Sequence, residues 1–465
     1  MTASDIMKAT GGRILYGNPD AAFTGVSIDS RTIGESELFV PLKGRTFDGH
    51  KFLIDALGRG GGAIVSSPPA EPVKGKTIIF VRSTLRALQD MARYERMKRD
   101  VTVIGITGTN GKTTTKELTA SILGISHKTL KNSGNFNNEI GLPLSLMRIG
   151  DDDEFAVLEM GASKRGDIRE LCEIAAPDFG AITNVGFGHI EGFGSLEAVR
   201  STKLELLETA KTVALNADDA FLMEGLIRGK SHWDEPVVVT FGIENSADVS
   251  ARDIVLEERH STFMLSMHGG AYTKVSLRVP GRFNIYNALA AASLCSAIGI
   301  KMTEIKHGIE SFSGVPMRLE LKECMGATVI SDVYNANPLS MEEALKELLR
   351  LKKSRAIAVL GDMLELGSYA EVAHRKLGKW MADLSVDIVI AVGPLMEKAA
   401  EEFFAGRGTC ITVSDSLAAG KALRELLREG DTVLVKGSRG MHMELVLEGH
   451  SGRIPVSAKE TEDAL

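Results

Sequence analysis

The feature that most constrains this chain is an apolar strand that runs directly into a glycine-bounded polar loop and then a helix. Residues 101–107 read VTVIGIT, residues 108–115 read GTNGKTTT, and residues 116–124 read KELTASILG. Such a segment forms a phosphate cradle, because the loop N–H groups and the helix N-terminus face the anion. In this pattern Lys112 reaches the β- and γ-phosphates, and Thr113 ligates Mg²⁺. The segment therefore predicts a site for ATP or GTP.

The loop departs in one respect from the usual phosphate-loop spacing, in which a second glycine precedes the Gly-Lys pair by five residues. Here Ile106 occupies that position and Gly105 lies one residue earlier, so the match is GxxGKT. The competing interpretation is a glycine turn followed by a surface lysine. The flanking strand and helix favour the phosphate site, but the loop does not indicate how the phosphate is used.

Length, charge and cysteine usage narrow the class of protein. At roughly 150 residues per domain, 465 residues predict about three domains. The net charge of −7 disfavours nucleic acid or an anionic membrane surface as the main partner. Residues 288–300, the longest weakly polar run, are too few to span a bilayer, and residues 1–12 lack a secretory pattern. Four separated cysteines without a CxxC motif are typical of reduced thiols, so we expect a cytoplasmic protein.

Strand and helix signals divide the chain into three predicted α/β domains. Residues 1–98 form a small α/β domain that ends in a helix expected from Leu85 to Lys98. Residues 99–313 form a central P-loop ATPase-like domain with a mostly parallel sheet and a small antiparallel addition at about 248–280. Residues 314–465 alternate five strands with four helices, which predicts a Rossmann-like, doubly wound sheet. The four helices are expected at about 338–350, 368–384, 394–405 and 415–429.

Two residues after later strands are candidates for metal or phosphate contact. Glu159 ends the apolar run FAVLE, where a neighbouring strand of a nucleotide site supplies a metal ligand. The alternative is a carboxylate that caps the following helix. His189 follows another strand in a segment with four glycines, GFGHIEGFG. A lone histidine is more often a satisfied core or surface residue, but this loop position favours ligand contact.

Lys203 is out of place in the pattern around it. In a helix expected at about 195–210, an apolar stripe contains Leu196, Val199, Leu206, Leu207 and Ala210, and Lys203 lies in its middle. Glu205 is expected to face the other way. A lysine on an apolar face snorkels, pairs with an acid or is chemically modified, and the pattern alone leaves snorkelling open.

Residues 132–143, NSGNFNNEIGLP, form a polar stretch directly before a helical run. One interpretation is a solvated loop that caps the helix. The other is a binding segment, because asparagine and serine side chains suit a substrate that carries many hydroxyl and amide groups.

Taken in order, these segments resemble the Mur ligase family over nearly the whole chain. They are TGTNGKTTTKE, GNFNNEIGLP, LEMGASKRGDI, TNVGFGHIEGFGS, Lys203, GRFNIYNALAA, SDVYNANPLSM, GDMLELG, VKGSRGMHME and the N-terminal SIDSRTIGESELFVPLKGRTFDGHKF. The resemblance implies an ATP- and Mg²⁺-dependent amide ligase of peptidoglycan precursor synthesis. The YNANP and GDMLELG segments imply the branch that joins UDP-N-acetylmuramoyl-tripeptide to D-alanyl-D-alanine through an acyl phosphate, giving the pentapeptide.

The resemblance also implies roles for individual residues. The phosphates of ATP are held by Gly108, Thr109, Asn110, Gly111, Lys112, Thr113 and Thr114, of which Lys112 is also catalytic. The other catalytic positions are Glu159, His189 and Lys203, which join Thr113 as metal positions, with Lys203 carbamylated to help hold a second Mg²⁺. Further ATP contacts are Asn284, Asn287, Arg318 and Asp332. Residues 1–98 are the UDP-sugar-binding domain, through Asp29, Ser30, Arg31, Lys43 and His50. The remaining substrate contacts are Asn135, Asn137, Asn138, Asn335, Asn337, Lys436, Ser438 and Arg439.

Two other functions stay open at this point. A sister amide ligase, such as the tripeptide synthetase or a folylpolyglutamate synthase, differs in the amine that it accepts. A nucleotide-switched binding protein needs only the phosphate loop and leaves Lys203 unexplained. We expect a monomer, because the sequence has no evident large apolar patch.

Overall fold

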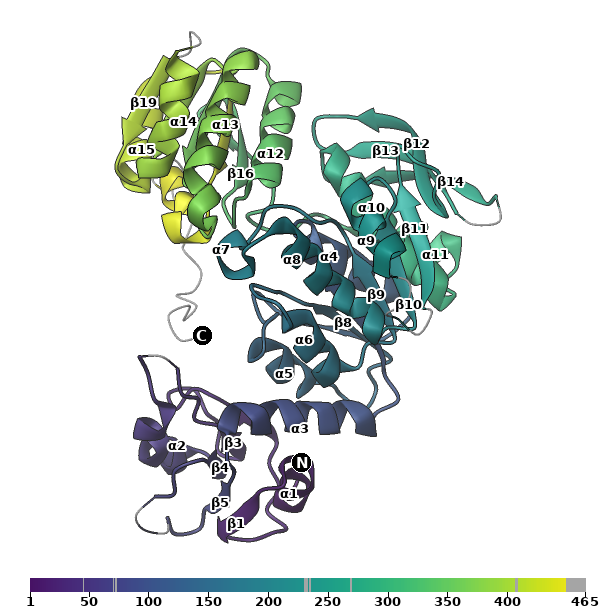
Figure 1. Ribbon diagram of the computed structural model, residues 1–465, viewed down its shortest axis with the longest axis vertical. Helices are drawn as coiled ribbons and strands as arrows, with labels where there is room; N and C mark the ends of the chain where they lie inside the picture. Colours follow the sequence, from purple (N-terminus) through teal and green to yellow (C-terminus); the bar gives the residue numbers. More distant parts are fainter. Residues whose placement is uncertain are drawn as a thin grey trace.

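The computed structural model describes residues 1–448, apart from residues 45, 70, 72, 230–232, 234–235, 268–269 and 406–408. The chain forms three α/β units, each built on one sheet, and Figure 1 shows them end to end along the long axis. The predicted three-domain α/β fold is confirmed. The boundaries at residues 98 and 313 stay a prediction, and residues 449–465, the end of the predicted third domain, lie outside the described residues.

The N-terminal unit is a five-stranded sheet in the order β1-β5-β4-β3-β2, in which β1 is antiparallel to β5 and the other neighbours are parallel. Its last helix, α3, starts where the Ser83 hydroxyl accepts the N–H of Arg86, close to the predicted start. The strands are β1 Arg13–Tyr16, β2 Gly25–Ser27, β3 Glu37–Phe39, β4 Gly62–Val65 and β5 Thr77–Phe80. The helices are α1 Ala3–Thr10, α2 Leu53–Arg59 and α3 Thr84–Lys98.

The central unit is a nine-stranded sheet in the order β14-β13-β12-β11-β10-β9-β6-β8-β7. Strands β7 to β12 and β6 are parallel, and β12, β13 and β14 form the predicted antiparallel addition. The strands are β6 Thr102–Thr107, β7 Thr129–Lys131, β8 Phe155–Glu159, β9 Phe179–Ile182, β10 Thr212–Asn216, β11 Val237–Gly242, β12 Val249–Leu256, β13 Ser261–Ser266 and β14 Tyr272–Leu277. The helices are α4 Lys112–Leu123, α5 Gly141–Leu146, α6 Asp167–Ala175, α7 Ile190–Phe193, α8 Leu196–Leu204, α9 Ala220–Gly229, α10 Arg282–Ile298 and α11 Met302–Ser311.

The C-terminal unit is a six-stranded sheet in the order β15-β16-β20-β17-β18-β19. All five predicted strands are present and parallel, so the doubly wound interpretation is confirmed. The strands are β15 Glu320–Cys324, β16 Ala327–Asp332, β17 Ala356–Gly361, β18 Ile388–Val392, β19 Thr409–Val413 and β20 Thr432–Lys436. The helices are α12 Pro338–Leu351, α13 Ala370–Asp383, α14 Pro394–Phe404 and α15 Ser416–Leu426.

One strand and two helix ends differ from the sequence prediction, and one of the two is α15, which was expected to reach about residue 429 and ends at Leu426. Strand β15, ELKEC, is an antiparallel edge strand with half-exposed residues, so it lacks the apolar run that marks the others. The helix expected at 195–210 ends at Leu204 and continues as a 3₁₀ turn, η2, over Glu205–Glu208. Glu205 is buried in this turn, and its carboxylate accepts the N–H groups of Gly166 and Arg169 at the start of α6.

The three units contact one another through polar side chains as well as apolar ones. Helix α3 packs on α5 and α6, where the Gln89 Nε2 donates to the Glu170 carboxylate at 2.8 Å and Arg96 pairs with Asp178 at 2.9 Å. On the other side, Arg350 of α12 donates to the backbone carbonyls of Leu256 and Glu257. No helix within the described residues has the length and apolar character needed to cross a membrane.

Candidate active site

The phosphate loop joins β6 to α4, and two glycines let it lie close to its neighbours. Gly108 has a φ of 148° and Gly111 a φ of 81°. A Cβ at Gly108 would lie 1.8 Å from the Thr183 Oγ1, and one at Gly111 would lie 2.2 Å from the Asn287 Oδ1. Glycine is therefore required at both positions. Among the described residues no side chain caps α4, so the first N–H groups of this helix can bind an anion.

Lys112 is the first residue of α4, and its side chain folds back over the loop. The Nζ donates to the carbonyls of Gly108 at 3.0 Å and Thr109 at 3.2 Å. Burial lowers the pKa of Lys112, the Glu159 carboxylate acts to raise it, and the Arg318 charge lowers it further. A bound phosphate would offset this by placing negative charge beside the ammonium.

Thr113 and Glu159 meet at the carboxyl ends of two adjacent strands, β6 and β8. The Thr113 Oγ1 donates to the Glu159 Oε2 at 2.8 Å, and the Asn137 Nδ2 donates to the Oε1 at 2.9 Å. A hydroxyl and a carboxylate beside a phosphate loop are hard oxygen donors of the kind that Mg²⁺ takes together with substrate phosphates. The donor set fits Mg²⁺. No group of three or more His, Cys, Asp or Glu side chains that could hold a metal occurs in the described part of the chain, and Mg²⁺ does not require one.

The wall of the loop is made by two residues that the sequence analysis did not single out. The Asn184 Oδ1 accepts the N–H of Asn110 at 2.9 Å, and its Nδ2 donates to the Asn110 carbonyl at 3.1 Å. The Thr183 Oγ1 donates to the same carbonyl at 2.5 Å. Both residues come directly after β9 in the segment TNVG, and this position at the end of a parallel strand is the sequence feature that could have indicated them.

Lys203 is buried in α8, with 3% of its surface exposed. Burial, and after it the charge of Lys112, holds the pKa of Lys203 well below its usual value. Its amine has no carboxylate within ion-pairing distance among the described residues. Snorkelling to solvent is excluded by this burial.

His189 connects the central unit to the C-terminal unit. It has a left-handed backbone with a φ of 53° at the N-cap position of α7, and its Nδ1 lies 2.7 Å from the Glu365 Oε2. This hydrogen bond lowers the pKa of Glu365, although burial opposes the shift. Next to it, the rings of Phe187 and Tyr369 stack with centroids 4.6 Å apart. The predicted metal position therefore lies at a domain interface.

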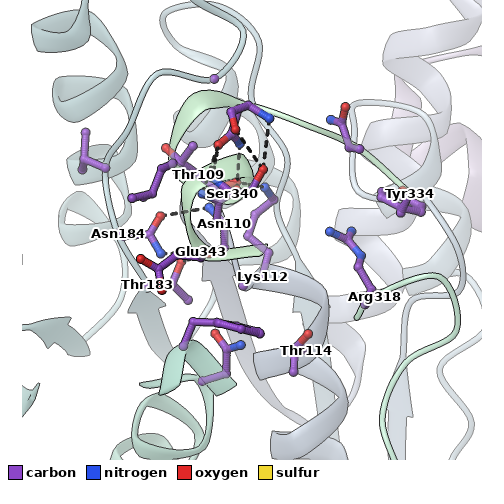
Figure 2. Close-up of a pocket in the computed structure, with 18 of the residues that line it drawn as sticks. Thr109, Asn110, Lys112, Thr114, Thr183, Asn184, Arg318, Tyr334, Ser340 and Glu343 are labelled. Atoms are coloured by element: carbon purple, nitrogen blue, oxygen red, sulfur yellow. Dashed lines mark hydrogen bonds between the residues drawn. The ribbon is translucent and has the colours of Figure 1, made fainter. Parts of the chain in front are cut away.

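Two residues of the C-terminal unit touch the phosphate loop directly. The Arg318 Nη2 donates to the Thr113 Oγ1 at 3.1 Å, and its guanidinium stacks on the Tyr334 ring at 3.9 Å. Asn337, the N-cap of α12, exchanges amide hydrogen bonds with Asn110. Figure 2 shows Arg318 and Tyr334 facing the loop from the opposite side of the cavity.

Asp332 and Lys436 form a buried ion pair at the carboxyl ends of β16 and β20. The Lys436 Nζ lies 2.5 Å from the Asp332 Oδ2 and donates to the Asn335 carbonyl at 2.9 Å. Burial lowers the pKa of Lys436, and the Asp332 carboxylate acts to raise it. Lys436 therefore holds the segment that runs from Asp332 to the N-cap of α12. Nearby, the Ser438 Oγ donates to the Ala336 carbonyl.

Asn284 and Asn287 lie in the first two turns of α10 and are buried behind the loop. The Asn284 Nδ2 donates to the Pro280 carbonyl at 2.7 Å, and the Asn287 Nδ2 donates to the Asn284 Oδ1 at 3.2 Å. The Asn287 Oδ1 also accepts from the Thr115 hydroxyl at 3.4 Å. These bonds fix α10 against α4.

A cavity of about 1290 Å³ lies between the central and C-terminal units. Figure 2 shows residues from both units around it. The predicted site residues that line it are Thr109, Asn110, Gly111, Lys112, Thr114, Asn135, Asn137, Asn138, Glu159, His189, Asn284, Asn287, Arg318, Asp332, Asn335, Asn337 and Lys436. The predicted site residues outside the lining are Gly108, Thr113, Lys203, Ser438, Arg439, Asp29, Ser30, Arg31, Lys43 and His50.

The last five of those residues belong to the N-terminal unit and are not brought to the cavity. Arg31 pairs with Asp29 at 2.8 Å on an exposed turn. The His50 Nε2 accepts the N–H of Ser66 at 3.1 Å, so its Nδ1 donates to Asp48 at 2.9 Å. The structure leaves their predicted substrate contacts untested.

The fold and the site together define a three-unit α/β protein in which a phosphate loop faces a cavity between the second and third sheets. Three family models match the chain: "Mur ligase family, catalytic domain" over residues 22–96, "Mur ligase middle domain" over 106–295, and "Mur ligase, glutamate ligase domain" over 317–439. The chain belongs to the Mur ligase family.

Individual relatives share nearly the full length. The UDP-N-acetylmuramoyl-tripeptide–D-alanyl-D-alanine ligase of Bacillus subtilis is 34% identical over 91% of this chain and 92% of its own. The Escherichia coli enzyme of the same name is also 34% identical, over 92% and 94%. Among solved structures, MurF from Acinetobacter baumannii is 30% identical with a TM-score of 0.89, covering 96% and 97%. MurF ligase from Thermotoga maritima, solved in complex with ADP, is 30% identical with a TM-score of 0.79, covering 91% and 96%.

Proposed function

We propose that this chain is an ATP-dependent amide ligase that adds D-alanyl-D-alanine to UDP-N-acetylmuramoyl-tripeptide, giving the pentapeptide precursor of peptidoglycan. One observation carries the proposal: Lys112 of the phosphate loop lines the same cavity as Arg318 of the C-terminal unit, and Arg318 reaches Thr113 at 3.1 Å. The relatives that carry this activity in their names match over more than nine-tenths of this chain.

The reaction has two transfers. The terminal carboxylate oxygen of the tripeptide attacks the γ-phosphorus of ATP, and the bond to ADP breaks, leaving an acyl phosphate. The amine of D-alanyl-D-alanine then attacks the acyl carbon and loses a proton, and phosphate leaves with the former carboxylate oxygen. Because phosphoryl transfer depends mainly on positioning and charge, the work of the protein is to hold the reactants in line.

Different residues around the loop bind the phosphates, supply positive charge and would hold the metal. The α4 N-terminus and Lys112 hold the phosphates, and Arg318 brings a second positive charge from the opposite unit. Thr113 and Glu159 would hold Mg²⁺, which supplies charge neutralisation at the transferring phosphoryl group when bound. His189 is the third metal position by family resemblance, and its present partner is Glu365.

Lys203 is proposed to act as a carbamate. An uncharged lysine amine is a nucleophile, and its addition to CO₂ with loss of a proton converts the side chain to an anion. Burial together with the nearby Lys112 charge keeps the Lys203 pKa low, which favours the reactive form. The resulting carboxylate would pair with Lys112 and offer oxygen ligands to a second Mg²⁺.

The contacts with the other substrates are proposed from the family resemblance. The N-terminal unit, proposed to span residues 1–98, takes the UDP-sugar end through Asp29, Ser30, Arg31, Lys43 and His50. The tripeptide end and the dipeptide approach the cavity through Asn135, Asn137, Asn138, Asn335, Asn337, Lys436, Ser438 and Arg439. The central and C-terminal domains are proposed to span 99–313 and 314–465. We propose that the protein works as a monomer in the cytoplasm.

An assay of ADP release with a panel of amines tests the proposal. ADP and pentapeptide should form only when Mg²⁺, ATP, UDP-N-acetylmuramoyl-tripeptide and D-alanyl-D-alanine are all present. Product from L-glutamate or a diamino acid in place of the dipeptide would indicate a sister ligase. Lys203→Ala should abolish activity, and a short carboxylate such as formate should restore part of it. A fully active Lys203→Ala variant would refute the carbamate.

A further inference from the structure

We infer that Asn132 and Lys116, neither of which lines the cavity, are positioning residues that hold Glu159 in place as a metal ligand. The inference rests on the proposed function only in taking Glu159 as a ligand of Mg²⁺. Both residues are almost fully buried, with exposed fractions of 1% for Asn132 and 2% for Lys116.

Asn132 extends the sheet by one residue with its side chain. Strand β7 ends at Lys131, which pairs with Val157 of β8. Beyond that point the Asn132 Oδ1 accepts the N–H of Glu159 at 2.9 Å, and the Nδ2 donates to the Glu159 carbonyl at 3.0 Å. The side-chain amide therefore takes the place of a peptide group, and it satisfies both backbone groups of the residue that carries the ligand.

The same amide fixes the loop that follows. The Asn132 Nδ2 also donates to the Phe136 carbonyl at 2.8 Å, which sets the path of the chain into Asn137. The Asn137 Nδ2 in turn donates to the Glu159 Oε1, and its carbonyl accepts the N–H of Gly161 at 2.8 Å. Glu159 is thus held at its backbone and at its carboxylate by one short segment, leaving the carboxylate aimed at Thr113.

Lys116 connects this segment to the phosphate loop. It lies on α4 one turn after Lys112, and its Nζ donates to the Asn132 carbonyl at 2.7 Å. Its charge is balanced by Glu117 at 3.1 Å, and Glu117 pairs in turn with Lys131. The helix that begins the phosphate site therefore also fixes the residue that positions the metal carboxylate. Mutation of a residue that holds a metal ligand in place typically lowers metal affinity 10- to 100-fold.

The test measures metal binding and not ligation. Mn²⁺ serves as the probe for Mg²⁺, and its binding to the full chain with ATP is followed by electron paramagnetic resonance. Asn132→Ala should weaken Mn²⁺ binding about tenfold or more, while ATP affinity measured calorimetrically in EDTA changes less than about threefold. Lys116→Met should weaken Mn²⁺ binding in the same direction.

Asp178→Ala is the matched control. Its Oδ2 accepts the N–H of Val103 at 3.1 Å, so it also holds a strand of the central sheet, but at the amino end of β6. This variant should bind Mn²⁺ as the wild type does. If Asn132→Ala does not fold, Asn132→Asp serves instead, because it keeps the acceptor for the Glu159 N–H and loses only the two donated bonds; it should also weaken Mn²⁺ binding.

Three results would overturn the inference: unchanged Mn²⁺ affinity in a folded Asn132 variant, an equal loss of ATP affinity in EDTA, or a wild-type chain that binds no Mn²⁺ with ATP. The two proposals can fail separately. If the variants bind Mn²⁺ more weakly than the wild type, as expected, but the wild type forms no pentapeptide, the proposed function is refuted and the assignment of Asn132 and Lys116 is supported.

Discussion

Asn110 of the phosphate loop and Asn337 at the N-terminus of α12 exchange two amide hydrogen bonds, 3.2 and 2.7 Å long, although they lie 227 residues apart. Asn337 also accepts the N–H of Ser340 as the cap of α12. The start of a helix of the C-terminal unit is therefore held against the phosphate loop. In the proposed reaction, this contact aligns the C-terminal unit with the γ-phosphate.

The substitution Asn337→Asp distinguishes the role of the hydrogen bond to Asn110 from the role of Asn337 as the N-cap of α12. Aspartate still caps α12 but cannot donate to the Asn110 Oδ1, so we expect kcat to fall about two- to tenfold, as for one lost neutral hydrogen bond. The Tm should be unchanged. Asn337→Ala should lower kcat similarly and also destabilise the fold by about 1 kcal/mol. Steady-state kinetics and thermal unfolding check both variants, and a wild-type kcat in Asn337→Asp would contradict this reading.

Arg318→Ala should have a larger effect than the asparagine change. Removing the charge that reaches Thr113 from the C-terminal unit should lower kcat about a thousandfold, since an arginine at a transferring phosphoryl group has effects of that order. Arg318→Lys should recover little, because a lysine does not reproduce the planar stacking on Tyr334. Single-turnover measurements of ADP formation test this. Equal kcat values for wild type and Arg318→Ala would show that Arg318 does not stabilise the transferring phosphoryl group.

The ion pair of Asp332 and Lys436 should show strong coupling in unfolding experiments. Lys436→Met leaves a buried carboxylate without its partner, so it should destabilise the chain by about 3–5 kcal/mol. The double variant Asp332→Asn with Lys436→Met should recover most of that loss, since no unpaired charge remains buried. Urea unfolding of the two single variants and the double variant gives the coupling energy. Purely additive effects would mean that the pair contributes no net interaction.

Lys203 should make stability depend on pH in a defined direction. Its pKa in the fold is well below the usual value of 10.5, so between those two values the unfolded chain binds a proton that the folded chain does not. Stability should therefore rise with pH in that window, by at most about 1.4 kcal/mol per unit. Lys203→Met lacks this dependence.

Urea unfolding of wild type and Lys203→Met in CO₂-free buffer, from about pH 7 to about pH 10, measures the difference. The free energy of unfolding of the wild type should increase relative to that of Lys203→Met as the pH rises. A constant difference across the range would show that the Lys203 amine is not held uncharged.

The local patterns in the sequence predicted most of the fold because buried parallel strands and amphipathic helices leave strong signals. Residues 102–107, 356–361 and 432–436 form fully or almost fully buried strands, and apolar runs of this kind predicted the parallel sheets of the central and C-terminal units. Strand β15 was missed because an edge strand with one exposed face has charged residues where the others are apolar.

The site was predictable where one short segment carries the chemistry, as in the phosphate loop. It was not predictable where the contact joins distant segments. Nothing local in GHI indicates that His189 meets Glu365, and nothing in KNSGN indicates that the Asn132 amide replaces a strand residue. Asn132 lies in a stretch that reads as a solvated or substrate-binding loop, because a peptide-like use of a side chain depends on the neighbouring strand.

The most direct test of the ligase mechanism follows one oxygen atom. UDP-N-acetylmuramoyl-tripeptide labelled with oxygen-18 in its terminal carboxylate is incubated with the wild-type chain, Mg²⁺, ATP and D-alanyl-D-alanine, and the released phosphate is analysed by mass spectrometry. The mechanism predicts that pentapeptide forms and that one labelled oxygen appears in each phosphate released. Pentapeptide formed with unlabelled phosphate would contradict the acyl phosphate, and ATP hydrolysis without pentapeptide would contradict the ligase function itself.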